Sequence, residues 1–153
     1  MGAYTPQTWA DSPATSSPLS AARLQYIEDG VAAIGRGWAA HTPTWTGLTI
    51  GDATVSTRYQ QFGKTVVYMG QVTFGAGSSY SGVFFPSLPV SPAGVSAVGS
   101  AWAFDTSATA WYTGVFVPGN YFLFGTVGRA APTVPITWAT GDILTWNLTY
   151  EAA

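Results

Sequence analysis

The clearest strand signal in the chain is the run Lys64-Thr65-Val66-Val67-Tyr68-Met69-Gly70-Gln71-Val72-Thr73-Phe74. Its β-branched and aromatic residues favour a strand, and we expect one long strand here. The residues before it, Gln61-Phe62-Gly63-Lys64, predict a turn. Further back, Val55-Ser56-Thr57-Arg58-Tyr59 alternates with the period of two that is typical of a strand. This part of the chain therefore predicts two strands joined by a turn.

Further strands are expected over the rest of residues 45–153. The candidates are 82–85, 97–104, 110–117, 121–126 and 143–150. A turn at Val117-Pro118-Gly119-Asn120-Tyr121 joins two of them. About eight short strands, punctuated by glycine and proline, predict a mainly β chain whose main domain is an antiparallel β-sandwich of the jelly-roll type.

The chain is short of charge, which excludes several functions. Asp, Glu, Lys and Arg make up 8% of its 153 residues, where a typical soluble domain has roughly a quarter. Nucleic-acid binding depends on phosphate neutralisation by Lys and Arg, so a net charge of −2 without a basic cluster predicts no nucleic-acid partner. The surface must instead be covered by 20 threonines and 13 serines.

Membrane insertion, secretion and cysteine chemistry are also disfavoured. The longest apolar stretches, 114–117 and 121–124, are far shorter than the roughly 20 residues of a spanning helix. Residues 1–6 have neither a basic start nor an apolar core, so we expect no secretory signal. The absence of cysteine excludes disulfides, Cys-ligated zinc and thiol catalysis.

The N-terminal residues 1–17 predict an extended arm, because proline restricts both itself and the residue before it. Two aromatic residues, Tyr4 and Trp9, stand in this polar segment and indicate that it docks on another protein. A frayed terminus is the alternative. The arm therefore gives the candidate anchoring residues Tyr4 and Trp9.

Residues 18–38 predict the only convincing helix, followed by a linker at 39–44 and the β domain at 45–153. Ser17 is the expected N-cap, and Pro18 then occupies the first helical position, where its missing N–H costs nothing. A glycine inside a helix costs about 1 kcal/mol of helix stability relative to alanine, so the helix could break at Gly30.

The apolar residues of this helix are spaced by 3, 4 and 3 residues, at Leu24, Ile27, Val31 and Ile34, and Trp38 follows four residues later. This is the a/d spacing of a coiled coil. With Leu24 at position a, Arg23 stands at g and Glu28 at e, where parallel chains place opposite charges next to one another. A helix packed on its own β domain would use the same spacing, so self-association is our expectation and intramolecular packing the alternative.

Acid–base chemistry finds little support. The single histidine, His41, has no acidic residue within ten positions, and a Ser-His pair needs a third orienting group. One histidine makes no metal site within a chain, although a threefold site with one His41 from each of three chains stays open. Asp52, Asp105 and Asp142 stand where aspartate stabilises turns. We therefore expect no enzyme activity, no cofactor and no metal.

Most of the seven tryptophans should be core residues. The neighbours Trp111 and Tyr112 would point to opposite faces of a strand, so one of the pair can be exposed. Because an exposed aromatic ring can stack on a sugar, these two residues are the candidate glycan contacts.

The N-terminal part of the chain contains two informative runs, Tyr4-Thr5-Pro6-Gln7-Thr8-Trp9-Ala10-Asp11 and Pro18-Leu19-Ser20-Ala21-Ala22-Arg23-Leu24-Gln25-Tyr26-Ile27-Glu28-Asp29-Gly30-Val31. Both runs resemble a pattern of small structural proteins of tailed bacteriophages: head fibres, capsid decorations, short tail fibres and minor tail proteins. Arg58-Tyr59-Gln60-Gln61-Phe62-Gly63-Lys64-Thr65-Val66 and Gly141-Asp142-Ile143-Leu144 are similar to segments of their β domains.

The resemblance implies a homotrimer on the virion exterior, assembled in the host cytoplasm, with the arm attached to capsid or tail proteins and the β domain outward. Capsid decoration or a head fibre is slightly favoured over the tail, because the chain offers no shaft beyond one helix. The alternative is a tail adhesin that binds host-surface glycans. An enzyme such as a glycan depolymerase is disfavoured, because no second catalytic group is evident.

Overall fold

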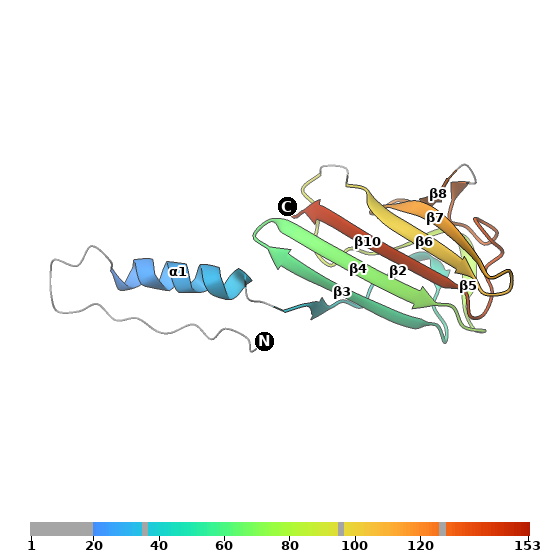
Figure 1. The fold of residues 1–153 in the computed structure, drawn as a ribbon, viewed down its shortest axis with the longest axis horizontal. Coiled ribbons are helices and arrows are strands. Elements are labelled where there is room, and N and C mark those ends of the chain that lie inside the picture. The colour runs from blue at the N-terminus through green and yellow to red at the C-terminus, as the bar shows by residue number, and fades with distance from the viewer. Residues whose placement is uncertain (1–19, 35–36, 95–96, 126–127) are drawn as a thin grey trace. The chain divides into compact units, whose positions relative to one another are not determined.

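The computed structural model describes residues 20–34, 37–94, 97–125 and 128–153 (Figure 1). Within these ranges it has a single helix, α1 (Ala21–Ile34), and ten strands. The chain divides into two compact units, Met1–Trp38 and Ala39–Ala153, with the helix in the first and all of these strands in the second. The expectation of a mainly β chain with one short helix is therefore confirmed.

The strands form two antiparallel sheets. The larger sheet has eight strands in the order β1 (Ala39–Ala40), β3 (Thr54–Phe62), β4 (Thr65–Thr73), β10 (Ile143–Glu151), β6 (Gly99–Asp105), β7 (Ala110–Val117), β8 (Tyr121–Phe124) and β9 (Gly128–Arg129). The smaller sheet pairs β2 (Trp45–Thr49) with β5 (Ser79–Pro86).

The C-terminal strand β10 lies in the interior of the larger sheet, between β4 and β6 (Figure 1). All nine of its residues pair with β4, from Ile143 opposite Thr73 to Glu151 opposite Thr65. Strand β4 also pairs with β3 through the expected turn, where Gly63 has a φ of +57°. Left-handed backbone of this kind favours glycine, which explains why this turn falls at Gly63.

The core lies between the two sheets. The Trp45 ring of β2 is 5.7 Å from the Trp146 ring of β10, and Phe84 of β5 is 6.2 Å from Phe74, which directly follows β4. Burial of each such side chain stabilises the fold by about 1.5–3 kcal/mol. The inward positions of β10 are all buried, namely Leu144, Trp146, Leu148 and Tyr150.

Turns are fixed by aspartate side chains that accept backbone N–H groups. Asp52 Oδ1 accepts the N–H of Gly77 at 2.7 Å, and Asp105 Oδ1 accepts that of Ala108 at 2.9 Å. The Asp105 bond is that of a turn-forming aspartate, as the sequence predicted. The Asp52 bond instead joins two loops that are 25 residues apart in the chain.

Helix α1 begins after Ser20, whose side-chain oxygen accepts the N–H of Arg23 at 3.3 Å. The predicted cap, Ser17, lies outside the described residues. Gly30 does not break the helix, which runs without interruption to Ile34. Trp38, the fifth member of the predicted apolar spacing, falls beyond α1.

Residues 39–44, which the sequence assigned to a linker, begin the β unit. Ala39 and Ala40 form β1 and pair with Tyr59 and Arg58 of β3. The Thr57 hydroxyl donates to the carbonyl oxygen of His41. These contacts join residues far apart in the chain, which explains why local sequence did not reveal them.

Candidate ligand-binding surface

The predicted helix residues lie on an exposed stripe of α1. Ile27 is 55% exposed and Val31 is 44% exposed, while Leu24 is half-buried. Arg23 and Glu28 flank this stripe on the same helix. The side chain of Ile34 and the anchoring residues Tyr4 and Trp9 lie outside the described part of the chain.

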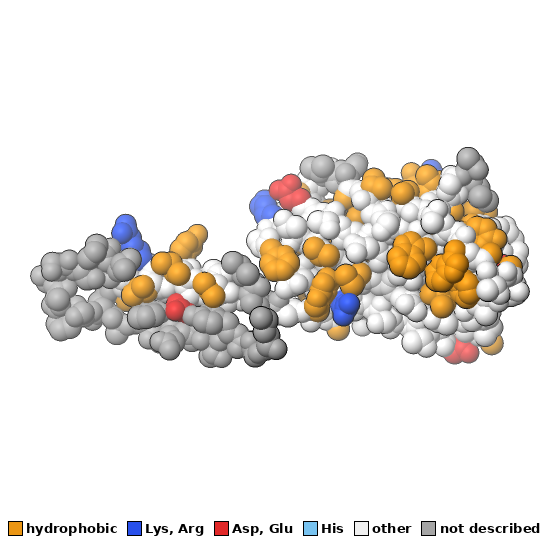
Figure 2. Space-filling model, viewed as in Figure 1, with side chains coloured by type: hydrophobic (Ala, Val, Ile, Leu, Met, Phe, Trp, Pro, Cys, Tyr) orange, Lys and Arg blue, Asp and Glu red, His pale blue; other side chains and the backbone are white. Residues whose placement is uncertain are grey.

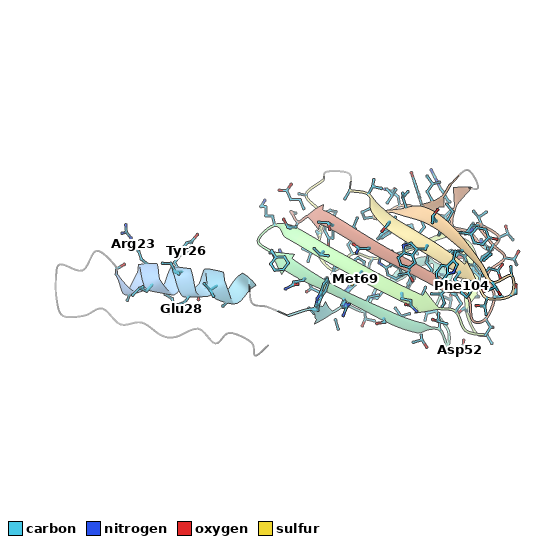
Figure 3. The ribbon with its side chains drawn as sticks, viewed as in Figure 1. Arg23, Tyr26, Glu28, Asp52, Met69 and Phe104 are labelled. Atoms are coloured by element: carbon cyan, nitrogen blue, oxygen red, sulfur yellow. The ribbon has the colours of Figure 1, made fainter. Side chains whose placement is uncertain are left out.

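Three aromatic residues whose rings are in contact lie on the outer face of the larger sheet, the face turned away from β2 and β5. We call Trp102, Phe104 and Trp111 the aromatic cluster. The ring of Trp111 lies 4.5 Å from that of Phe104 and 6.1 Å from that of Trp102. Trp102 is 47% exposed and Trp111 is 60% exposed. Figures 2 and 3 show this apolar area around the labelled Phe104.

Strand alternation explains why the cluster points outward. On β6 the small residues Ala101 and Ala103 are buried, so Trp102 between them faces solvent. On β7 Trp111 faces outward, whereas its neighbour Tyr112 packs against the core. Of the two candidate glycan contacts, Trp111 therefore lies on the outer surface and Tyr112 does not join it.

Trp102 and Phe104 belong to the aromatic cluster, but the sequence analysis did not identify them as surface residues. The signal was present in the sequence as two alanines that alternate with two large aromatics. In an ordinary half-buried strand the large residues face the core, so this pattern alone would have assigned the aromatics to the wrong face.

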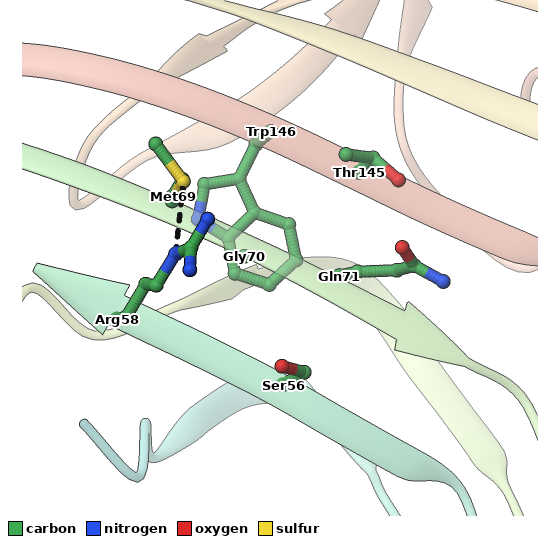
Figure 4. A pocket seen from close by; sticks show the side chains of 7 residues that line it. All are labelled: Ser56, Arg58, Met69, Gly70, Gln71, Thr145 and Trp146. Atoms are coloured by element: carbon green, nitrogen blue, oxygen red, sulfur yellow. Dashed lines mark hydrogen bonds between the residues drawn. The ribbon is translucent and has the colours of Figure 1, made fainter. Parts of the chain in front are cut away.

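A hollow of about 320 Å³ lies beside the cluster on the outer face (Figure 4). It is lined by residues of three neighbouring strands, β3, β4 and β10: Ser56, Arg58, Met69, Gly70, Gln71, Thr145 and Trp146. We call it the polar hollow, because hydroxyl, amide and guanidinium groups surround it. Arg58 Nε donates to Met69 Sδ at 3.3 Å across its edge.

The polar hollow and the aromatic cluster are contiguous through the strand register. Thr145 stands opposite Gln71 of β4 on one side and opposite Trp102 of β6 on the other. Gln71 in turn stands opposite Ser56 of β3. Facing residues on adjacent strands are direct neighbours, so one row of side chains leads from the hollow to the cluster.

His41 is held by structural contacts. Its Nε2 lies 3.3 Å from the carbonyl oxygen of Ser87, and its ring packs edge-on against Tyr68 at 5.6 Å and Tyr59 at 6.4 Å. In the described part of the chain, groups of three or more His, Cys, Asp or Glu that could hold a metal ion are not found.

Four titratable groups of the described residues have clearly shifted pKa values. Burial raises the pKa of Tyr68, Tyr80 and Tyr150, so these phenols stay protonated over the ordinary pH range. The Ser107 hydroxyl, followed by the N–H of Ala108, lowers the pKa of exposed Asp105. These shifts disfavour both the phenols as bases and Asp105 as an acid.

Comparisons with known proteins provide no relative from which the role of this surface could be inferred. No family model, no curated protein and no solved structure matches the chain. Of the helices in the described ranges, none has the length and apolar character to cross a bilayer.

Proposed function

We propose that the chain is a non-enzymatic structural protein of the exterior of a bacteriophage virion, on capsid or tail. It assembles as a homotrimer through α1, is held by residues 1–17 and presents the β unit outward. The proposed fold of the β unit is the β-sandwich of the jelly-roll type that the sequence predicts, and the packing of an eight-stranded sheet against a two-stranded sheet supports it. The virion location is proposed from the resemblance described above. One structural observation supports the homotrimer.

That observation is the exposed apolar stripe of α1. A helix of 14 residues is marginal by itself in water, and the exposure of Ile27 and Val31 leaves part of its apolar surface uncovered. Packing against two copies of the same helix would bury this stripe, and Arg23 of one chain would then lie near Glu28 of the next.

We expect Ile27→Asp to dissociate the trimer, because each of three chains would place a carboxylate in the apolar seam. Light scattering coupled to size-exclusion chromatography measures the mass, which should fall from three chains to one. Tyr26→Asp is the matched control, since Tyr26 is 82% exposed and stands outside the a/d positions. A monomeric parent protein, or an unchanged mass of the Ile27→Asp protein, would refute self-association through α1.

The virion location is tested separately. Antibodies against the β unit, applied to intact purified particles and imaged by electron microscopy, should label the capsid or the tail. Particles that carry the chain only inside the capsid, or lack it, would contradict an exterior structural role.

A second candidate function is adhesion to host-surface glycans. The specific observation in its favour is the exposed Trp111 ring in contact with two further aromatic rings on the outer face. This function is compatible with the first, because an exterior virion protein can also bind.

A further inference from the structure

We infer that the aromatic cluster and the polar hollow together form one binding site for an acidic oligosaccharide. The inference rests on the second candidate function and deepens it, since it assigns the residues of the site and the chemistry of its ligand. It is independent of self-association through α1.

The aromatic cluster supplies the stacking part of the site. A pyranose ring has an apolar face of C–H groups, and burial of this face against an indole ring removes apolar surface of both partners from water. Trp102 and Trp111 are exposed while they contact one another. Contiguous exposed aromatics of this kind mark interaction sites on soluble proteins.

The polar row supplies hydrogen bonds beside the stacking rings. The hydroxyls of Thr145 and Ser56 and the amide of Gln71 each can donate and accept, as sugar hydroxyls require. They follow Trp102 in register on successive strands. Three strand steps from Trp102 to Ser56 span about 14 Å, so the row can accommodate several linked sugar rings.

The charge of the polar hollow selects an acidic ligand. Arg58 is the charged residue among the side chains that line it, and that set contains no Asp or Glu. A guanidinium has five N–H donors. Arg58 directs its Nε–H to Met69 Sδ and has a further interaction within the protein. Guanidinium groups recognise carboxylates by paired hydrogen bonds, so a uronate carboxylate at Arg58 completes the site.

A second copy of this chain is a less suitable occupant. The centre of a protein interface is packed as densely as a protein interior. Here the surface contains a hollow of about 320 Å³. That volume falls in the range of small-ligand sites, roughly 300–1,000 Å³.

The test uses the full chain, with glucuronate-containing oligosaccharides and their carboxyl-reduced counterparts as probes in calorimetry. We expect the parent protein to bind the uronate form more tightly. Trp111→Ala and Trp102→Ala should each weaken binding by about tenfold or more. Arg58→Gln should abolish the preference for the uronate while binding to the reduced form persists.

Phe62→Ala is the matched control, because Phe62 is an exposed aromatic on β3 outside both the cluster and the hollow. It should leave binding unchanged, and circular dichroism should show that all variants stay folded.

Sugar binding that survives both tryptophan substitutions would overturn this site but leave glycan adhesion standing. Failure of the parent to bind either probe set would overturn the inferred site, and adhesion to other glycans would then be tested on a glycan array. A lower mass of Trp111→Ala in light scattering would instead identify a second copy as the occupant and overturn the inference.

Discussion

At the scale of single residues, buried Asp142 is the side chain on which the loops at one end of the larger sheet converge. Its Oδ1 accepts the N–H of Thr106 at 2.9 Å, and its Oδ2 accepts the N–H of Ala139 at 2.8 Å. Asp142 as a whole is 2% exposed. Because its partners are backbone groups, it connects the turn between β6 and β7 to the loop that precedes β10.

We expect Asp142→Ala to lower the free energy of unfolding by about 3 kcal/mol, because two N–H groups lose a charged acceptor. Urea unfolding followed by tryptophan fluorescence measures the change. Glu151→Ala removes an exposed carboxylate from the same strand region and should cost little. Equal effects of the two substitutions would contradict a structural role for the Asp142 carboxylate.

The orientation of Trp111 and Tyr112 shows what local sequence can predict and what it cannot. The sequence predicted that Trp111 and Tyr112 point to opposite faces, and the structure places them so. It did not say which one is exposed, because alternation fixes relative orientation but not which face the second sheet covers. The same ambiguity concealed Trp102 and Phe104.

At the scale of structural elements, β4 and β10 fit together through a glycine. Gly70 stands opposite Trp146, and a methyl group added there would lie 2.6 Å from Trp146 Cε2 and 2.8 Å from Thr57 Cγ2. The small residue on β4 therefore makes room for the largest side chain on β10. In a long strand rich in β-branched residues, Gly70 is required by this packing and not by backbone conformation.

We expect Gly70→Ala to destabilise the protein by about 1–3 kcal/mol, since overpacking forces the indole or the strand to shift. Urea unfolding gives the stability, and near-ultraviolet circular dichroism reports the altered environment of Trp146. The control is Gln71→Ala, which changes the adjacent exposed residue of the same strand. A Gly70→Ala protein as stable as the parent would show that the indole can move away without cost.

The sequence predicted some strands correctly and missed others. The strand expected over Lys64–Phe74 is β4, Thr65–Thr73, and the strand expected over 143–150 is β10, Ile143–Glu151. Their composition favours a strand wherever they lie. Strand β1 was missed, because two alanines become a strand only by pairing with Tyr59 and Arg58 of β3.

At the scale of the whole molecule, the sheet order makes the β unit depend on its last strand. Strand β10 alone links β3 and β4 on one side to β6, β7 and β8 on the other within the eight-stranded sheet. Partners this distant in sequence require closure of a long loop before any contact forms. The first unit, Met1–Trp38, is compact by itself and contributes no strand among the described residues.

We expect deletion of residues 143–153 to abolish the cooperative unfolding transition, because the sheet loses its central strand and the buried side chains of β10. Deletion of residues 1–38 should leave a folded β unit with the parent β circular dichroism signal. Thermal and urea unfolding of both truncated chains provide the measurement. A cooperative transition without β10, or an unfolded 39–153 fragment, would be inconsistent with this division.

By itself, the sequence determined the class of secondary structure, the helix with its apolar spacing, the turn-forming role of Asp105 and the shortage of charge. These properties are local, because they follow from composition and from periodicity along one segment. Only the tertiary structure decided the order of the strands, the pairing of Gly70 with Trp146, and which aromatic residues lie outside. It also placed Thr145 between Gln71 and Trp102, because neighbours across a sheet are set by long-range hydrogen bonding and by the face that the core covers.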